Sequence, residues 1–392
     1  GCIAAYAWND EEIRKNYELS DLLYMRLTIE ESLGKITNPS VVAFSCYVWN
    51  MEYNLKLARL VKERYPDCLI VFGGHNVPDD ISLLEKYSFI DVLMHAEGEE
   101  PFTLLLKEIL KDREFSSVPD ISFRKGADII VTEKKRVYDI SGYPSPYTAG
   151  LFDRIFEEYP NVNFHATLET NRGCPYSCAF CDWCFTKKIR YFPIEKIYAE
   201  IEWMAEHKIT YCYCADANFG ISKRDLDIAN YILKKKTETG YPQVFKPCYA
   251  KESDDTVFEI GKILNHSGID KGVTLAYQSL NEKTLENIGR KNLTLEHYAD
   301  LTARYAEEKI PTYTELILGM PGETYESFCR GLCDLLENGQ HNSMTVYTCQ
   351  VYCNSPLAQK EYKEKHGIRW EREPLHGIHY PANFNGVQEY YD

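Results

Sequence analysis

The sequence predicts an α/β protein with two domains: a Rossmann-like (flavodoxin-type) parallel sheet, followed by a partial parallel barrel of six strand–helix units. The chain has 392 residues, which is enough for two domains of roughly 100–200 residues each. Short apolar runs alternate with amphipathic stretches over the first ~110 residues, as in a doubly wound sheet. The alternation resumes near residue 164 and repeats six times, which favours a barrel.

The front domain is predicted from three apolar runs. Residues 40–45 are β-branched and aromatic, as in a buried strand, and a second run at 68–72 stops at a glycine pair. The third run covers 92–95. Residues 54–63 show helical spacing, and further helices are expected at 80–87 and from Pro101 onward.

Ligands of parallel sheets bind at the carboxyl ends of the strands. The sequence therefore predicts a binding edge in the front domain. Its candidate residues are Ser45, Cys46, Tyr47, Gly73, Gly74, His75, Glu97, Gly98 and Glu99.

The second domain is predicted from six further strands, at 164–170, 210–214, 245–250, 272–277, 312–318 and 344–352. Helical stretches fall between them, for example at 194–206, 223–236 and 323–337. Catalytic residues of such barrels lie on the loops that follow the strands.

The expected boundaries follow from this alternation. Residues 1–115 form the front domain and 161–355 the barrel. Residues 116–160 read as a connector with a hairpin near 125–128, and 356–392 as a tail or the start of a truncated domain.

Composition limits the classes of function. The chain has 44 Lys and Arg against 59 Asp and Glu, a formal charge of −15, which disfavours binding to nucleic acid. No apolar run approaches the ~18–20 residues of a membrane span, and no secretory leader is recognisable. We therefore expect a cytoplasmic protein whose 14 Cys residues are thiols or metal ligands rather than disulfides.

Four cysteines stand within eleven residues, at Cys174, Cys178, Cys181 and Cys184. Thiolates select zinc, Cu(I) or iron–sulfur clusters. A structural zinc site normally takes four ligands, often as two pairs, and a second CxxC pair is missing. The last three cysteines match a ferredoxin-type C-x2-C-x2-C, without its fourth ligand and following proline.

The alternative ligand set is Cys174, Cys178 and Cys181, which would leave one iron of a cubane open for catalysis. This CxxxCxxC spacing, in a loop after a strand, resembles the signature of the radical S-adenosylmethionine (SAM) superfamily. The resemblance implies a [4Fe–4S] cluster whose open iron chelates SAM, with Cys184 as a bystander. A zinc site and a ferredoxin-like electron carrier are the alternatives.

The resemblance continues along the barrel and implies SAM contacts. It assigns the adenine to Phe180 and to the segment from Glu315 to Gly319, and the amino group to Asp216. The ribose and carboxylate contacts would come from Gln278, Ser279 and Arg290. Gln278 and Ser279 could instead be strand-end caps, and Arg290 a charge on a helix surface. The segment from Gly319 to Gly322 could be an ordinary strand-to-helix turn.

Residues 1–110 resemble the cobalamin-binding domain that precedes the barrel in one large subfamily. Gly73 and Gly74 would let a backbone lie close to a large planar ligand, and Ser45 would bond the nucleotide tail. The Asp-x-His-x-x-Gly cobalt-ligand motif is absent: His95 lies on the third strand, and the first strand of that domain is expected to precede Gly1. The alternative is a domain that has lost its ligand.

Together the resemblances imply a cobalamin-dependent radical SAM methyltransferase. One SAM would methylate the cobalamin and a second would yield a 5′-deoxyadenosyl radical, so that methylcobalamin transfers its methyl group to an unactivated carbon of a small molecule or peptide. An external one-electron reductant of flavodoxin or ferredoxin type would be required. The alternatives are a rearrangement or cyclisation with the same cofactors, and RNA methylthiolation, which the negative charge disfavours.

Overall fold

The computed structural model describes residues 1–251, 255–375, 383–384 and 386–391. The chain forms two compact units. The first contains Gly1–Tyr138, Phe180–Phe185 and Gln350–Asp392, and the second contains Asp139–Ala179 and Thr186–Cys349. None of the described helices is long and apolar enough to cross a membrane.

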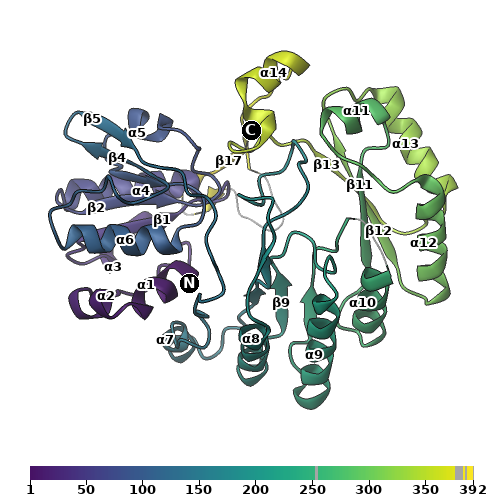
Figure 1. Cartoon of the computed structure of the whole chain (residues 1–392), viewed down its shortest axis with the longest axis horizontal. Helices are drawn as coiled ribbons and strands as arrows, with labels where there is room; N and C mark the ends of the chain where they lie inside the picture. Colours follow the sequence, from purple (N-terminus) through teal and green to yellow (C-terminus); the bar gives the residue numbers. More distant parts are fainter. Residues whose placement is uncertain (252–254, 376–382, 385, 392) are drawn as a thin grey trace. The chain divides into compact units, whose positions relative to one another are not determined.

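The first unit is built on one mixed sheet in the order β1-β2-β3-β4-β5 (Figure 1). Three strands are parallel: β1 (Val41–Ser45), β2 (Leu69–Gly73) and β3 (Val92–Met94). Two antiparallel strands follow, β4 (Ile121–Lys125) and β5 (Asp128–Val131). The helices of its first 110 residues are α1 (Cys2–Asn9), α2 (Glu11–Asn16), α3 (Ile29–Lys35), α4 (Met51–Arg64), α5 (Ser82–Lys86) and α6 (Glu99–Ile109).

Both faces of this sheet are buried at β2, which explains the uninterrupted apolar run in that strand. Ile70 and Phe72 belong to one core with Val61 of α4. Val71 points to the other face and belongs to a second core with Leu105 of α6. Successive side chains of a strand alternate between faces, so a doubly covered strand must be apolar at every position.

The hairpin expected near 125–128 is part of the front sheet. Met94 of β3 pairs with Ile121 of β4, and β4 pairs in turn with β5. The stretch after residue 116, expected as a connector, therefore contributes two strands to the first unit.

The segment expected as a tail also contributes to the first unit. It carries η1 (Pro356–Ala358), α14 (Lys360–His366) and the short strands β14 (Glu373–Pro374), β15 (Asn383–Phe384), β16 (Val387–Gln388) and β17 (Tyr390–Tyr391). Val387 is buried in the same core as Ile70 and Phe72. The C-terminal residues thus help to close the front core.

The second unit has six parallel strands in two three-stranded sheets, ordered β10-β9-β6 and β11-β12-β13. They are β6 (Ala166–Leu168), β9 (Tyr211–Cys214), β10 (Val244–Lys246), β11 (Val273–Gln278), β12 (Thr312–Leu318) and β13 (Met344–Thr348). All six overlap the predicted strands. Among the described residues no ladder joins β10 to β11, so the six strands do not form one continuous sheet.

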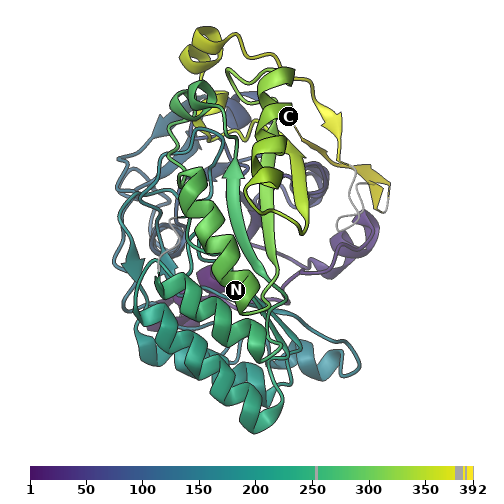
Figure 2. The same ribbon diagram turned by 90° about the vertical axis from the view of Figure 1, so that its right-hand side faces the viewer.

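Helices accompany these strands in the alternation that the sequence predicts (Figures 1 and 2). They are α8 (Ile194–Glu206), α9 (Arg224–Thr239), α10 (Asp255–His266), α11 (Glu282–Asn287), α12 (Leu295–Glu307) and α13 (Tyr325–Glu337), preceded by α7 (Asp153–Glu158). Because each helix returns the chain to the same edge, the loops after the strands collect at one end of each sheet.

Candidate functional site: the strand ends of the two units

The segment that leads into the cysteine motif is held by a short antiparallel ladder. β7 (Asn171–Arg172) pairs with β8 (Arg190–Tyr191), and the Cys174 amide donates to the Thr186 carbonyl at 3.0 Å. Gly173 between them has φ +110°, and a Cβ there would collide with the carbonyl oxygen of Lys188. Glycine is therefore required at the entrance to the motif.

Nitrogen donors converge on the first two cysteines. The Asn218 side-chain amide lies 3.2 Å from the Cys174 sulfur, and the Lys251 ammonium lies 3.3 Å from the Cys178 sulfur. Nη1 of Arg290 is 3.9 Å from the same Cys178 sulfur. Hydrogen bonds to the sulfur atoms of an iron–sulfur cluster influence its reduction potential, so these donors are of the kind found around such a cluster.

The motif-based prediction missed Asn218 and Lys251. Both follow a strand of the barrel, β9 and β10 respectively, so their position was a usable signal. What the sequence does not give is the direction of their side chains.

Cys181 and Cys184 belong to the first unit, whereas Cys174 and Cys178 belong to the second. Among the described residues, no group of three or more His, Cys, Asp or Glu side chains is arranged to hold a metal ion. The three-cysteine ligand set therefore stays a prediction. The donors around Cys174 and Cys178 fit it.

Asp216, expected at the SAM amino group, is fully buried and already has partners. Its carboxylate accepts hydrogen bonds from the backbone amides of Thr170 at 2.7 Å and Asn171 at 3.2 Å. The Thr170 hydroxyl and, at 2.8 Å, the Asn171 side chain also donate to it. Burial raises its pKa to about 7, against the lowering effect of these bonds. This geometry gives Asp216 a positioning role, because it fixes the turn that leads to Gly173 and Cys174.

Three other expected SAM contacts lie together at the end of β11. Gln278 is buried, has φ +65° and lies where the register between β11 and β12 shifts. The Ser279 hydroxyl donates to Glu323 and accepts from the Asn281 amide at 3.1 Å. Arg290 is buried, donates to the Ala276 carbonyl and reaches toward Cys178. Arg290 thus links the end of β11 to the cysteine motif.

The remaining expected SAM contacts are placed separately. Glu315 lies within β12, where burial raises the pKa of its carboxyl group. Gly319 follows β12, is exposed and has φ +93°. Phe180 is half-buried and belongs to the first unit.

At the front strand ends, the structure gives Gly74 and Cys46 a role of their own. Gly74 has φ +105°, and a Cβ there would lie 2.7 Å from the Cys46 carbonyl oxygen. The glycine therefore lets two loops of the protein pass close to each other, and the expected approach to a ligand stays a prediction. Cys46 is fully buried, and burial raises its pKa to about 12, so its thiol is a core group.

Four stacked rings lie beside this crossing, within the first unit. Tyr47 stacks on Trp49 with ring centres 4.6 Å apart, and lies 5.9 Å from the His75 ring. His75 stacks on Phe185 at 4.6 Å and contacts the Asp182 carbonyl through Nδ1 at 3.0 Å. The faces of these rings are turned toward one another, so they form a compact aromatic stack at the strand ends of the first unit. Trp49 and Phe185 were missed, although the alternation Tyr47-Val48-Trp49 marks the first of them.

The third predicted edge, at the start of α6, is tightly packed. Glu97 and Glu99 are buried, and a Cβ on Gly98 would lie 2.8 Å from the Ile3 side chain. His95 is buried, with Nε2 2.9 Å from the Ser122 hydroxyl.

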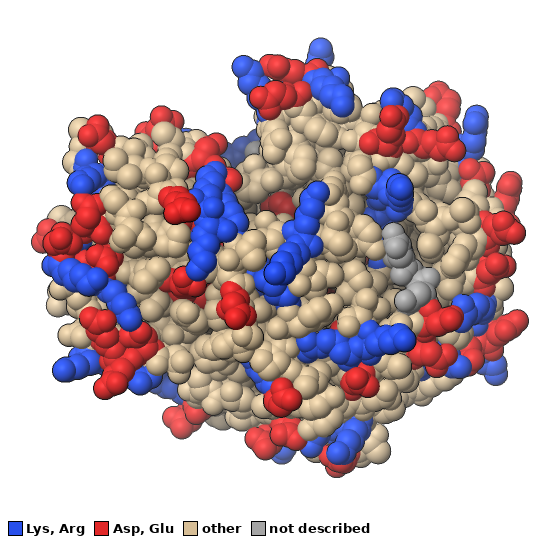
Figure 3. All heavy atoms as spheres, in the orientation of Figure 1, with Lys and Arg blue, Asp and Glu red and all other residues tan. Residues whose placement is uncertain are grey.

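The surface in Figure 3 shows basic and acidic side chains interspersed, without a continuous basic area on that face. A nucleic-acid backbone would need such an area. The charges on this face are therefore mixed in sign.

Comparison with known proteins identifies both domains. The family model "Radical SAM superfamily" matches residues 168–330, and the model "B12 binding domain" matches residues 16–106. These are the two domains that the sequence predicts, in the predicted order. Their cofactors are a [4Fe–4S] cluster with SAM, and cobalamin.

Two curated relatives match 94% of the chain. The cobalamin-dependent radical SAM methyltransferase TokK of Streptomyces tokunonensis is 42% identical over 376 residues. The 2-(S-pantetheinyl)-carbapenam-3-carboxylate methyltransferase of Streptantibioticus cattleyicolor is 41% identical over 376 residues. The chain spans about 55% of the length of each.

Solved structures show the same fold. The radical SAM methyltransferase TsrM of Kitasatospora setae aligns with a TM-score of 0.70 at 17% identity, covering 95% of this chain and 75% of that one. The cobalamin-dependent radical enzyme OxsB aligns with a TM-score of 0.66 at 14% identity, covering 93% of this chain and 56% of that one. The predicted α/β class and family are thereby confirmed: the chain belongs to the cobalamin-dependent radical SAM family, with its B12-binding domain ahead of its radical SAM domain.

Proposed function

We propose that the protein of which this chain is part is a cobalamin-dependent radical SAM methyltransferase that acts on a small molecule. The observation that carries the proposal is the identity of 42% and 41% to two methyltransferases over 94% of the chain. The second relative is named for 2-(S-pantetheinyl)-carbapenam-3-carboxylate. A carbapenam of this kind is therefore the first substrate to test.

When bound, the cluster, SAM and cobalamin would supply the radical and the methyl group. The residues of the chain would hold and orient them. Cys174, Cys178 and Cys181 are the proposed iron ligands. The donors at the first two sulfurs would influence the reduction potential of the cluster.

The end of β11 is the proposed binding surface for the amino acid and ribose parts of SAM. Arg290 presents a buried cation there, next to Cys178, which suits a carboxylate. Gln278 and Ser279 add polar groups at the same strand end. The strand ends of the first unit, with the Tyr47 and His75 rings, are the proposed cobalamin edge.

The proposed partners are a small-molecule substrate and an external one-electron reductant of flavodoxin or ferredoxin type. The small-molecule substrate follows from the name of the second relative. The reductant follows from chemistry, since reductive cleavage of SAM consumes one electron that the chain itself does not supply.

Anaerobic reconstitution tests the proposal. The chain is purified with iron, sulfide and hydroxocobalamin, and its corrinoid spectrum and iron content are measured. We expect one corrinoid and about four irons per chain, and 5′-deoxyadenosine from SAM once a reductant is added. Absence of bound corrinoid would contradict the methyltransferase proposal.

The substrate assignment has its own test. The reconstituted protein is incubated with the pantetheinyl carbapenam, and the product mass is measured. A new product heavier by one CH₂ supports methylation, whereas a new product of unchanged or hydrogen-depleted mass supports rearrangement or cyclisation. Cys178→Ala is the matched control and should form neither product nor 5′-deoxyadenosine.

A further inference from the structure

In the loop between β1 and α4 (residues 46–50, here the β1–α4 loop), the side chain at the helix-capping position does not cap the helix. Asn50 precedes α4, where an Asn side chain normally accepts from the first helical amides. Here its Oδ1 accepts from the Tyr47 amide at 2.7 Å, and its Nδ2 donates to the Ser45 carbonyl at 2.9 Å. Within the described part of the chain it makes no cap bond to the helix. The side chain folds the loop and leaves the α4 amides in need of other acceptors.

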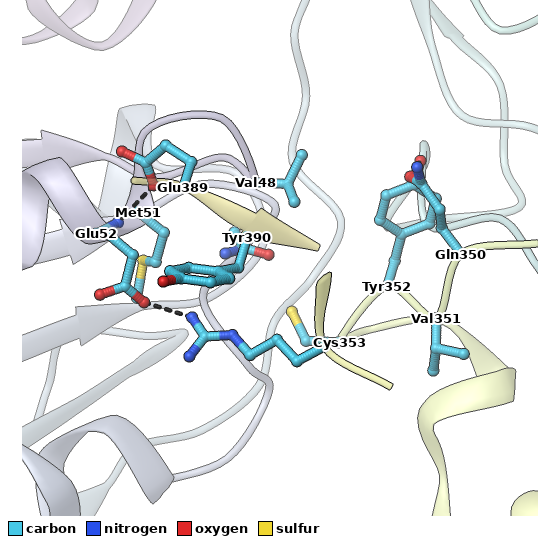
Figure 4. A pocket seen from close by; sticks show the side chains of 11 residues that line it. Val48, Met51, Glu52, Gln350, Val351, Tyr352, Cys353, Glu389 and Tyr390 are labelled. Carbon is cyan, nitrogen blue, oxygen red and sulfur yellow. Dashed lines mark hydrogen bonds and ion pairs between the residues drawn. The ribbon is translucent and has the colours of Figure 1, made fainter. Parts of the chain in front are cut away.

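A residue from the far end of the chain supplies these acceptors. The Glu389 carboxylate accepts from the Glu52 amide at 2.8 Å and the Tyr53 amide at 3.0 Å, across 337 and 336 residues of sequence. Figure 4 shows Glu389 directed at the start of α4. Its side chain is 1% exposed. A buried anion at a helix N-terminus is stabilised by the amides and by the helix dipole.

Arg26 completes the arrangement and ties it to the loop. It pairs with Glu389 at 2.8 Å, and it donates to the Trp49 carbonyl at 2.8 Å and to the Val387 carbonyl at 3.1 Å. The buried charge of Glu389 is therefore compensated, and removal of either partner would leave the other poorly solvated. The same guanidinium joins the last residues of the β1–α4 loop to the C-terminal segment.

The C-terminal segment also borders a pocket of the first unit. Glu389 and Tyr390 line it together with Val48 and Met51, and residues 350–353 line it too (Figure 4). Val387, two positions before Glu389, is buried in the front core. The segment is thus anchored on one side by apolar packing and on the other by the Glu389–Arg26 pair.

From this arrangement we infer that Glu389 is a positioning residue for the cobalamin-binding edge of the front domain. It holds the start of α4, and through Arg26 the end of the β1–α4 loop, in the conformation that presents Tyr47 and Trp49. The link to cobalamin rests on the proposed function; the positioning of the loop does not. The C-terminal segment therefore contributes to the cobalamin-binding edge of the first unit.

Hydrogen exchange and cobalamin binding on the full chain test the inference together. Glu389→Gln keeps the shape but removes the charge, and we expect the amides of residues 46–53 to exchange roughly tenfold faster. We expect the loop to be ordered in only about a tenth of the Glu389→Gln molecules, so the cobalamin dissociation constant should rise about tenfold, because the apparent constant is the intrinsic one divided by the ordered fraction. Both are measured at a temperature at which circular dichroism shows equal folding. Glu389→Asp retains the charge and should restore part of both effects.

Glu63→Gln is the matched control. Glu63 lies at the other end of α4, is exposed and pairs with Arg59 at 3.8 Å, so its side chain does not hold the loop. It should leave both readouts unchanged. Unchanged exchange in Glu389→Gln would overturn the positioning role, and faster exchange with unchanged cobalamin affinity would overturn its link to the cofactor. If the unaltered chain binds no corrinoid, the proposed function fails, and the exchange data alone then decide the role of Glu389.

Discussion

At the residue scale, the Cys178 sulfur lies beside two cations, Lys251 and Arg290, and the Cys174 sulfur beside the Asn218 amide. Nitrogen donors around thiolates stabilise the negative charge on sulfur. In an iron–sulfur site such donors also influence the reduction potential. The side chains beside the cysteines are therefore informative about the redox properties of the site.

The ligand set can be tested by comparing two cysteines of the same motif. Cys178→Ala removes a proposed ligand, so we expect loss of most of the iron and of the charge-transfer absorption. Cys184→Ala removes the proposed bystander and should retain both. Iron analysis and visible spectroscopy of the two reconstituted variants give the answer, and the reverse pattern would refute the assignment.

The Asn218 amide should raise the reduction potential of the cluster. Asn218→Val removes the donor to Cys174, and we expect the midpoint potential to fall by about 60 mV, equivalent to about 1.4 kcal/mol for one electron. A redox titration followed by electron paramagnetic resonance measures it. Asn230→Ala, on the exposed face of α9, is the control. An equal potential in both variants would show that the Asn218 contact does not act on the cluster.

Asp216 should make stability depend on pH. Burial raises its pKa to about 7 in the folded state, against roughly 3.9 in an unfolded chain. The folded state therefore binds an extra proton between these values. The resulting stability is complete below about pH 4 and is lost as the pH rises through 7, which amounts to a few kcal/mol.

Urea unfolding at pH 5 and pH 8 checks this expectation. The unaltered chain should lose stability toward pH 8, and Asp216→Asn should flatten that dependence. Asp227→Asn, at an exposed position of α9, should keep it. A slope that persists in Asp216→Asn would assign the pH dependence to another group.

At the element scale, the β7–β8 ladder holds the segment that leads into the cysteine motif, and Gly173 in this segment has no room for a side chain. Gly173→Ala would bring a Cβ against the Lys188 carbonyl oxygen, at a strain of about 1–3 kcal/mol. We expect reduced iron incorporation with little change in far-ultraviolet circular dichroism. The matched control is Gly126→Ala, which also has positive φ but has no described atom within 4 Å of the added Cβ. Equal iron content in both variants would contradict the importance of the ladder.

At the scale of the whole molecule, ligand binding should stabilise the chain. A ligand that binds only the folded state at 100 times its dissociation constant adds about 2.7 kcal/mol. We therefore expect hydroxocobalamin to raise the melting temperature and chelation of iron to lower it. Differential scanning fluorimetry under anaerobic conditions measures both changes, with adenosine as the non-binding control. A melting temperature that does not change when cobalamin is added would argue for a front domain that does not bind this cofactor.

The sequence by itself determined the features that depend on local pattern. The strands around Ile70 and along 312–318 were predictable because apolar runs and their spacing report burial directly. The cysteine motif was recognisable because cluster ligation requires a fixed spacing within one loop. The order of the two domains was likewise predictable from the alternation of strands and helices.

The tertiary structure alone decided which polar groups meet. Asp216 binds the turn before the motif, Gly74 serves a crossing of two loops, and Glu389 caps a helix 337 residues away. Such pairings depend on long-range packing, which leaves no periodic trace in the sequence. A carboxylate at the end of the chain gives no sign of the buried amides that it accepts from, because only folding brings them together.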